Sequence, residues 1–338
     1  MILITGASGF LGGYLVDEFL KHGFKVRAMA RSTSDLTHLK KTNAEIIFAD
    51  LKNSSELKSA LNGISEVIHA AALLGVRGNS QKDFLEVNYE AVKKLADLCV
   101  EKKIKRFTFI SSIAAVGPII GKDNLLDENA LSSSLSGFYG QSKYKAEEYL
   151  LSLGKSVKME IVILRPGLIY GPNDKRCAAN YFRIANLGFF PIPLPADNKA
   201  SFIYVTDAAK AVFLAHTKSL PNEIYMLAND VATFKEFGQK LLLTRGKKFS
   251  FLIPVPRWMV NIIAFAAAFI FILSGKSTSI RGRIKDIGRG NWAVDNSKIK
   301  TKLGFVPEVS LTQGLKQSWD FYFQNKEILN VTYLIKSI

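Results

Sequence analysis

A glycine-rich stretch near the start of the chain constrains the fold more than any other feature. Three apolar residues, Ile2, Leu3 and Ile4, lead directly into glycines spaced by three, and a helical pattern follows. In this order of strand, turn and helix, the first glycine permits a tight turn, the second lets the backbone approach a pyrophosphate, and the third lets the helix pack closely on the strand. The helix N-terminus then faces the phosphates.

The stretch therefore predicts a dinucleotide-binding site, because it follows a strand and opens a helix. A purely structural turn is the alternative. The residues that we expect to contact the cofactor here are Gly6, Ser8, Gly9, Phe10, Leu11 and Gly12.

Alternating elements in the first half of the chain predict the fold class. Short β-rich runs alternate with helical stretches, of which residues 83–102 are the longest clear example. Such alternation predicts an α/β fold with a doubly wound parallel sheet. The expected strands are residues 2–5, 25–30, 45–49, 67–70, 106–111 and 160–165.

The pattern loosens after Gly171. Pro191, Pro193 and Pro195 are expected to break any regular element in their neighbourhood. We expect residues 1–170 to form a cofactor-binding domain and residues 171–327 to form mainly a smaller substrate-binding part, interleaved with elements that return to the sheet. Residues 328–338 are an apolar extension to which we assign no role.

The composition limits the classes of protein that fit. Hydrophobic residues make up 48% of the 338 residues, which is enough for a sizeable core and excludes a disordered chain. Cys99 and Cys177 give neither a disulfide framework nor metal-ligand spacing, so we expect no metal. No apolar leader precedes the first strand, so we expect no signal peptide, and both features suit a reducing cytoplasm.

The net charge of +16 is compatible with nucleic acid, anionic lipid or an anionic substrate as partner. The basic residues are spread along the chain, and no nucleic-acid-binding motif is visible. We therefore expect no nucleic-acid partner.

The end of the second expected strand bears on the choice of cofactor. An acid at this point would bond the ribose hydroxyls of NAD, but the chain has Ala30 and then Arg31. An arginine there can pair with the 2′-phosphate of NADP. The alternative is an ordinary solvated arginine.

The next two strand ends carry further candidate contacts. Asp50, followed by Leu51, stands where an acid can bond the adenine amine, although it could also cap the following helix. The small residues after the fourth strand let a cofactor lie against the backbone. We interpret His69 as an ordinary core or strand-end histidine. The small residues are Ala70, Ala71 and Ala72.

Two serines and a tyrosine–lysine pair supply the candidate chemistry. Ser111 and Ser112 end a strand, at the sheet edge where ligands bind in open α/β folds. Tyr139 and Lys143 are four residues apart and share one helix face. A free tyrosine, with a pKa of about 10, is a poor base at neutral pH.

A nearby ammonium favours the phenolate and lowers the tyrosine pKa. Tyr139 could then exchange a proton with a substrate oxygen, which a serine hydroxyl would hold. A plain surface pair on a helix is the alternative, because this spacing is common by chance.

Together the motifs resemble an extended short-chain dehydrogenase/reductase of the NAD-dependent epimerase/dehydratase superfamily. The resemblance covers residues 1 to about 323. The matching set is Thr5-Gly6, Gly9, Gly12, Asp50-Leu51, His69-Ala70-Ala71, Asn88, Ser111-Ser112, Tyr139, Lys143, Arg165-Pro166 and Tyr170-Gly171-Pro172.

The resemblance implies a Rossmann domain, a nicotinamide cofactor and a Ser-Tyr-Lys catalytic group. By that match Ser112 orients the substrate, Tyr139 is the acid/base, and Lys143 binds the ribose and tunes Tyr139. Ser112 is preferred to its neighbour because it stands five residues before Gly117, as in relatives. Further implied residues are Asn88 in a structural or proton-relay role, and Pro166 and Ile169 as cofactor contacts.

Three features resemble the branch of 3β-hydroxysteroid and sterol-4α-carboxylate dehydrogenases. Residues 202–207 and a closing pattern from Asn291 to Trp319 are shared partly with nucleotide-sugar epimerases. The third, an uncharged run from Trp258 to Leu273, discriminates between the branches. Relatives in the steroid branch often prefer NAD. Arg31, which favours NADP, therefore departs from the pattern of that branch.

At 16 residues the run from Trp258 to Leu273 is shorter than the ~20 that span a bilayer. Basic residues follow it, so we expect a monotopic contact with anionic lipid. A buried helix of the substrate-binding part is the alternative. The basic residues are Lys276, Arg281, Arg283, Lys285 and Arg289.

These features predict an oxidoreductase at the cytoplasmic face of a membrane. We expect it to move hydride between NADP(H) and a secondary alcohol or ketone of a sterol-like, isoprenoid or long-chain acyl substrate, with NAD(H) as the second choice of cofactor. A nucleotide-sugar epimerase, dehydratase or reductase is the alternative, with Arg281 or Arg283 as diphosphate ligands. A cofactor-binding regulator without turnover is disfavoured by the full catalytic group, and a homodimer is left open.

Overall fold

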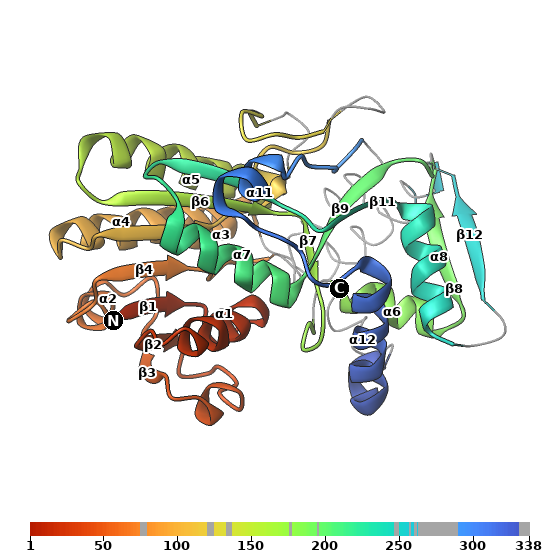
Figure 1. Cartoon of the computed structure of the whole chain (residues 1–338), viewed down its shortest axis with the longest axis horizontal. Helices are drawn as coiled ribbons and strands as arrows, with labels where there is room; N and C mark the ends of the chain where they lie inside the picture. Colours follow the sequence, from red (N-terminus) through yellow and green to blue (C-terminus); the bar gives the residue numbers. More distant parts are fainter. Residues whose placement is uncertain are drawn as a thin grey trace.

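A seven-stranded parallel sheet runs through the protein and positions the predicted site (Figure 1). The strand order is β3-β2-β1-β4-β5-β6-β10, and each neighbouring pair is parallel. The strands are β1 (Ile2–Thr5), β2 (Val26–Ala30), β3 (Glu45–Phe48), β4 (Glu66–His69), β5 (Arg106–Ile110), β6 (Glu160–Pro166) and β10 (Glu223–Leu227).

The computed structural model describes residues 1–74, 80–119, 125–132, 137–175, 178–194, 196–246, 250–256, 258–259, 262 and 290–330. Within them, all six strands expected from the sequence are present, with ends that differ by one residue at most. The predicted doubly wound α/β class is confirmed.

Helices cover both faces of the sheet, because successive strand residues point to opposite sides. Ile2 and Ile4 pack with α1, α7 and α11, whereas Leu3 packs with α2, α4 and α5. The helices are α1 (Phe10–Lys21), α7 (Val205–Lys218) and α11 (Ser297–Leu303) on the first face, and α2 (Ser54–Ala60), α4 (Ala91–Glu101) and α5 (Phe138–Ser156) on the second.

The expected helix over residues 83–102 is present as three consecutive segments. They are α3 (Gln81–Leu85), the π-helical segment η2 (Glu86–Glu90) and α4. The wider π turn carries Asn88, whose side chain is buried. Such π segments interrupt α-helices mainly at functional positions.

A second core lies beside the sheet, on the right in Figure 1, and is built from the later half of the chain. Its strands and helices are β7 (Leu168–Tyr170), β8 (Phe189–Pro193), β9 (Lys199–Tyr204), β11 (Asp230–Thr233), β12 (Phe251–Val255), α6 (Ala179–Asn186), α8 (Phe234–Thr244), α12 (Leu311–Gln324) and η4 (Lys326–Leu329). Between them, α7, β10 and α11 return to the large sheet. The division at residue 170 stays a prediction.

The expectation that prolines break regular structure near residue 191 is wrong, because Pro191 and Pro193 lie within β8. Among the described residues, this strand pairs with β12 on one side only. The N–H of Leu194 donates to Val255 O at 3.0 Å, and backbone groups alternate along a strand. The two proline nitrogens therefore face the open edge, where no ladder hydrogen bond is lost.

Several predicted features lie outside the described residues. These are Cys177, Pro195, the basic cluster from Lys276 to Arg289, residues 331–338 and most of the apolar run, of which only Trp258, Met259 and Ile262 are described. Over the part of the chain that is described, no helix is long and apolar enough to cross a membrane.

Candidate active site

The predicted site residues line up along the carboxyl edge of the large sheet. From β1 the chain moves outward through β2 and β3, and it then crosses back to β4 on the other side of β1. This reversal between β1 and β4 is the point where open α/β sheets bind ligands. Gly6 follows β1, Arg31 follows β2, Ala70 follows β4 and Ser111 follows β5.

The loop after β1 is shaped so that only glycine fits at two positions. Gly6 has a positive φ of 70°, and a Cβ there would lie 2.7 Å from the Ala71 backbone. A Cβ on Gly12 would lie 2.0 Å from Gly6 O. The Gly9 N–H donates to Gly6 O at 2.9 Å and closes the turn. The backbone thus forms a narrow cradle with no side chain in the way, as a bound pyrophosphate requires.

Helix α1 begins within this loop, and its first N–H groups have no partner in the helix. The first helical bond is donated by Gly13 to Gly9 O at 3.0 Å, so Phe10, Leu11 and Gly12 have no acceptor within the helix. The first turn contains no acidic residue. Together with the helix dipole, these groups fit an anion such as the cofactor phosphates.

Arg31 and Asp50 lie exposed at the next two strand ends. The Arg31 N–H donates to Ser34 Oγ at 3.2 Å, which shapes the turn after β2. Asp50 Oδ1 accepts the Lys52 N–H at 2.8 Å, whereas the N-cap of α2 is Asn53. The alternative that Asp50 caps this helix is therefore wrong. Leu51 is half-buried against the core, and Ala71 and Ala72 after β4 are also half-buried.

His69 is a core histidine, as interpreted from the sequence. Its ring is fully buried and its Nδ1 atom lies 2.8 Å from Thr5 Oγ1. Burial, reinforced by the Lys143 ammonium, lowers the pKa of His69 to about 3. The ring is therefore neutral at physiological pH.

Lys143 lies in the interior at the end of β5. Its side chain is buried, and its ammonium donates to Ile110 O at 2.8 Å and lies 4.5 Å from the Phe109 ring centroid. Burial lowers the pKa of this lysine to about 7, while the Glu147 carboxylate opposes the change. A lysine this deep is neither a solvated residue nor part of a surface pair, so the surface alternative is excluded for Lys143.

Tyr139 lies in the first turn of α5, one turn before Lys143. Its ring is half-buried and meets Phe84 edge to face, with ring centroids 6.3 Å apart. Its backbone carbonyl accepts the Ser142 hydroxyl at 2.7 Å. The tyrosine thus lies on the same helix as the lysine and is held at the start of that helix.

Asn88 connects this helix to the segment after β4. Its Nδ2 atom donates to Ser142 Oγ at 3.1 Å and to Leu73 O at 3.0 Å, and its Oδ1 accepts the Leu73 N–H at 2.8 Å. Both polar atoms of the buried Asn88 side chain are thus hydrogen-bonded within the protein. The geometry supports the structural role that the resemblance implied for Asn88.

The two serines differ in their hydrogen bonds. Ser112 is half-buried, and its Oγ accepts the Ala114 N–H at 3.1 Å as the N-cap of η3 (Ile113–Ala115), which packs against α5. Ser111 is buried, and its Oγ has no hydrogen-bond partner among the described residues. A buried hydroxyl at this edge that lacks a protein partner is suited to a ligand contact.

Sequence reasoning missed the partner of Arg165. This arginine and Glu147 form a buried bidentate ion pair, with N–O distances of 2.7 to 3.1 Å, between β6 and α5. One signal was available, since an arginine in an otherwise apolar buried strand needs a buried acid. Glu147 follows Lys143 by four residues and so shares its helix face.

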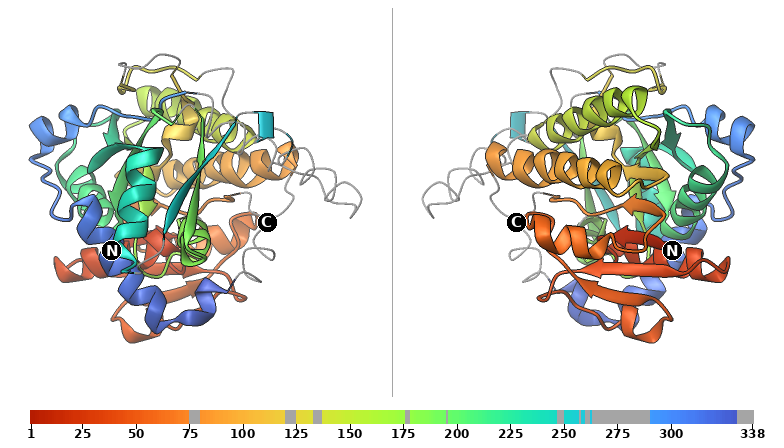
Figure 2. Two further views of the ribbon diagram at one scale, coloured as in Figure 1. Left: turned by 90° about the vertical axis from the view of Figure 1, so that its right-hand side faces the viewer. Right: turned by 90° about the vertical axis from the view of Figure 1, so that its left-hand side faces the viewer.

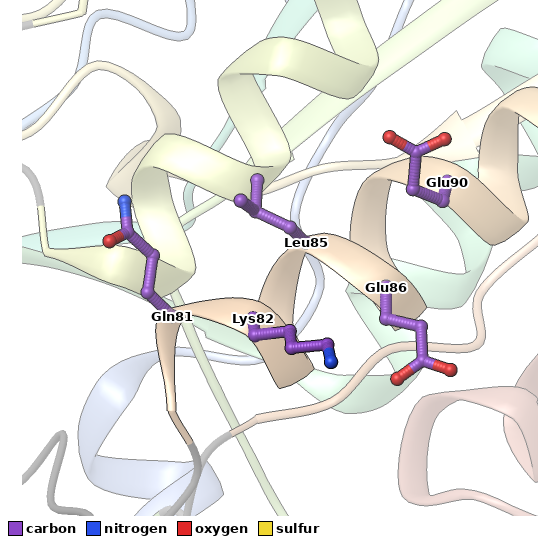
Figure 3. A pocket seen from close by; sticks show the side chains of 5 residues that line it. All are labelled: Gln81, Lys82, Leu85, Glu86 and Glu90. Carbon is purple, nitrogen blue, oxygen red and sulfur yellow. The ribbon is translucent and has the colours of Figure 1, made fainter.

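A shallow hollow of about 440 Å³ lies outside this site (Figure 3). Its lining side chains all project from α3 and η2. It contains none of the predicted site residues, so we assign it no role in the chemistry. The lining residues are Gln81, Lys82, Leu85, Glu86 and Glu90.

Comparisons with known proteins agree with this arrangement. The model of the "NAD dependent epimerase/dehydratase family" matches residues 2–228. A UDP-glucose 4-epimerase of Vibrio cholerae is 30% identical, over 96% of this chain and 95% of its own. A decarboxylating sterol-4-alpha-carboxylate 3-dehydrogenase of Dictyostelium discoideum is 24% identical, over 94% and 99%.

The fold is also similar to that of solved structures. The crystal structure of a Thermus thermophilus UDP-glucose 4-epimerase in complex with NAD has a TM-score of 0.77 and 21% identity, covering 95% of this chain and 98% of its own. At that identity the likeness concerns the fold alone.

Proposed function

The chain belongs to the NAD-dependent epimerase/dehydratase family, and we propose that it moves hydride between NADP(H) and the carbon of a secondary alcohol or ketone in an apolar substrate. It is an NAD(P)-dependent enzyme that acts on CH–OH groups. The choice of NADP, the substrate class and the residue roles are the parts that we propose.

One observation carries the catalytic assignment. Lys143 is buried at the carboxyl end of β5 with its ammonium on Ile110 O, one helical turn from Tyr139. A lysine ammonium held beside the tyrosine hydroxyl would favour the phenolate form of Tyr139. We assign Lys143 to this tuning and to contact with the cofactor ribose.

Tyr139 and Ser112 would act on the substrate oxygen. The Tyr139 hydroxyl gives or takes the proton as the oxygen changes between alcohol and carbonyl. Ser112, at the end of β5 and against α5, holds the same oxygen by a hydrogen bond. The bound nicotinamide supplies or accepts the hydride.

The cradle and the three free N–H groups of α1 would hold the cofactor pyrophosphate. Arg31, exposed after β2, would pair with the 2′-phosphate of NADP, and Asp50 would bond the adenine amine. Ala70, which follows β4, and Pro166, which ends β6 on the other side of β5, would contact the cofactor between adenine and nicotinamide. Ile169, half-buried on β7, would do the same.

An apolar surface at one end of the molecule supports an apolar substrate and membrane contact. Strands β8 and β12 form a two-stranded ribbon at this end, which faces the viewer on the left of Figure 2. Phe190 and Leu252, partners in the ribbon, lie against Gly238 of α8. The residues that alternate with Phe190 in β8 and with Leu252 in β12 therefore face away from α8, and all of them are apolar. They are Phe189, Pro191, Pro193, Phe251, Ile253 and Val255, here called the outer face.

The outer face continues into exposed apolar residues along the chain. Phe251, Ile253, Trp258 and Ile262 are between 44% and 62% exposed. The sequence has no acidic residue between Glu236 and Asp286, although it has several basic ones. We propose that this end rests on an anionic lipid surface, at the cytoplasmic side, so that a lipid-like substrate enters from the bilayer.

The second candidate is a nucleotide-sugar epimerase, dehydratase or reductase. It is favoured by the relative at 30% identity, a UDP-glucose 4-epimerase. The cofactor cradle and the Ser-Tyr-Lys group serve both chemistries equally. The proposed diphosphate ligands Arg281 and Arg283 lie outside the described residues.

A cofactor-coupled absorbance screen tests the function. Sterols and long-chain hydroxyacyl or oxoacyl compounds in mixed micelles form one panel, and nucleotide sugars form the other, each with NADP(H) and NAD(H). Products of the second panel are also separated by chromatography, because epimerisation and dehydration return the hydride and leave cofactor absorbance unchanged. We expect turnover in the apolar panel, abolished by Lys143→Ala. Turnover with nucleotide sugars alone would overturn the apolar substrate class while leaving the catalytic group intact.

A further inference from the structure

The Lys143 ammonium occupies a position where a charge is costly. It is buried, and the groups around it come from three elements: Ile110 O and the Phe109 ring on β5, His69 on β4, and Glu147 on α5. His69 is neutral, and the carbonyl and the ring offer only dipoles. Glu147 is the one group in this set that carries a full negative charge at neutral pH.

Glu147 is held in place by Arg165. The Arg165 Nε atom lies 3.1 Å from both carboxylate oxygens, and Nη2 lies 2.7 Å from Oε2. The side chains are 1% exposed for Glu147 and 4% exposed for Arg165. This fork geometry leaves the carboxylate little freedom to rotate.

Arg165 is itself anchored on the other side. Its Nη1 atom donates to Glu128 O at 3.1 Å and to Ala130 O at 3.4 Å. The guanidinium therefore uses both Nη1 donors on backbone carbonyls of the segment before α5. The carboxylate is fixed from β6 and from this segment together.

We propose that Glu147, clamped by Arg165, is a positioning residue that keeps the buried Lys143 ammonium charged and directed at the edge of β5. The importance of Glu147 for activity rests on the proposed catalytic role of Lys143. Its effect on the charge of Lys143 does not depend on that role. An opposite charge one helical turn away favours the charged form of a lysine. In agreement, the Glu147 carboxylate acts against the burial that lowers the Lys143 pKa to about 7.

A purely structural role for the pair makes a different prediction. A buried ion pair often adds little net stability, because desolvation offsets the attraction. If Glu147 and Arg165 only joined α5 to β6, removal of both charges would change stability and leave the titration of Lys143 unchanged. The titration of Lys143 therefore separates the two roles.

The test follows the Lys143 titration directly by NMR, in the full chain with isotope-labelled lysine. The Lys143 signal is assigned by its loss in Lys143→Met. In Glu147→Gln, which keeps the size and the hydrogen-bonding oxygen, we expect the Lys143 midpoint to fall by about one pH unit or more. Glu147→Asp retains a carboxylate and should restore most of the wild-type midpoint.

Glu148→Gln is the matched control, because Glu148 is the next residue on α5 and is exposed. It should leave the Lys143 midpoint unchanged. Should Glu147→Gln fail to fold, Glu147→Gln combined with Arg165→Met removes both charges together; the midpoint should then fall by less than in Glu147→Gln alone, because loss of the Arg165 cation favours the charged lysine. A folded variant of either kind with a wild-type midpoint would overturn the proposal, whatever the catalytic screen finds.

Discussion

The Thr5 hydroxyl and the Nδ1 atom of His69 lie 2.8 Å apart, fully buried, and join the ends of β1 and β4. These are the two strands between which the order of the sheet reverses. The His69 ring stacks near Phe107 and Phe109, with centroids 6.1 Å and 5.9 Å away. Such surroundings accept a neutral imidazole and penalise an imidazolium.

This burial predicts a specific loss of stability in acid. The folded-state pKa of His69 is lowered to about 3, below the unfolded value of about 6.5. The stabilisation from the buried neutral ring is therefore fully present above pH 6.5, and this part of the unfolding free energy is lost as the pH falls from 6.5 toward 3. At pH 4 this linkage removes roughly 3 kcal/mol of unfolding free energy.

Urea unfolding at pH 7 and pH 4 measures the effect. His69→Asn keeps hydrogen-bonding groups but does not titrate, so its stability should fall less between the two pH values than that of the wild type. His38→Asn, which removes an exposed histidine, should behave as the wild type does. Equal pH dependence of wild type and His69→Asn would contradict the argument.

Two neighbouring glycines on α1 are expected to differ sharply in their tolerance of alanine. At Gly12 a Cβ would lie 2.0 Å from Gly6 O, so Gly12→Ala has to displace the cofactor loop. At Gly13 it would lie 3.2 Å from the His38 ring, a movable side chain. Gly12→Ala should weaken cofactor binding by about a hundredfold or more, equivalent to about 3 kcal/mol.

Gly13→Ala is the matched comparison. It should bind cofactor normally and change stability by less than about 1 kcal/mol, because a gain in helix propensity offsets the contact with His38. Fluorescence titration with NADPH and thermal unfolding give the two quantities. Normal cofactor binding by Gly12→Ala would show that the loop is not the phosphate cradle.

Six of the seven strands were predictable because they are short β-rich runs ended by residues of small size or special chemistry, whereas β10 was not among the expected strands. A side chain at Gly6 or Gly12 would clash with neighbouring backbone. The three-residue intervals between the glycines had already indicated that these positions need glycine. Lys143 was predicted as part of the site, but its burial was not, since helix spacing says nothing about which face points inward. The core position of His69 was predicted correctly.

Interactions between distant residues were not predictable from local patterns. The Glu147–Arg165 pair joins α5 to β6 across a fold that must exist before the partners can be matched. The π turn at Asn88 depends on bonds to Leu73 and Ser142, which lie on other segments. Pro191 is tolerated in β8 because the strand is an edge, and that is a property of the sheet rather than of the sequence.

Arg31 is expected to set the preference for NADP(H). It is exposed at the end of β2, free to reach a 2′-phosphate through charge-assisted hydrogen bonds. Such bonds are worth about 1.5–3 kcal/mol, or roughly ten- to a hundredfold in affinity. Arg31→Ala should lose this factor for NADPH and change little for NADH, as fluorescence titration would show. Equal affinity of the wild type for the two cofactors would exclude the preference.

Tyr139→Phe is expected to separate chemistry from binding. It keeps the ring against Phe84 and removes only the proposed acid/base oxygen. Turnover should fall by about a hundredfold or more, while cofactor affinity remains near that of the wild type. Tyr144→Phe, on the same helix just past Lys143, serves as control and should retain activity. A Tyr139→Phe enzyme with wild-type turnover would refute the assigned mechanism.

If the outer face contacts the membrane, aspartate substitutions on it are expected to abolish vesicle binding. Phe251 and Ile253 are 61% and 44% exposed on that face, so aspartate there should cost little folding stability. The same change puts a charge where apolar side chains would enter the acyl boundary. Flotation with anionic vesicles should show binding by the wild type, weakened by salt because the flanking cations meet anionic head groups.

The matched control for this experiment is Leu243→Asp. Leu243 is 78% exposed, but it lies on α8, which packs against the opposite side of the ribbon. Phe251→Asp and Ile253→Asp should each lose vesicle binding, as should Ile263→Asp in the apolar run, whereas Leu243→Asp should keep it. If the wild type ignores anionic vesicles at low salt, the outer face is not a lipid contact. The substrate would then have to reach the site through water, and that outcome would favour a nucleotide sugar.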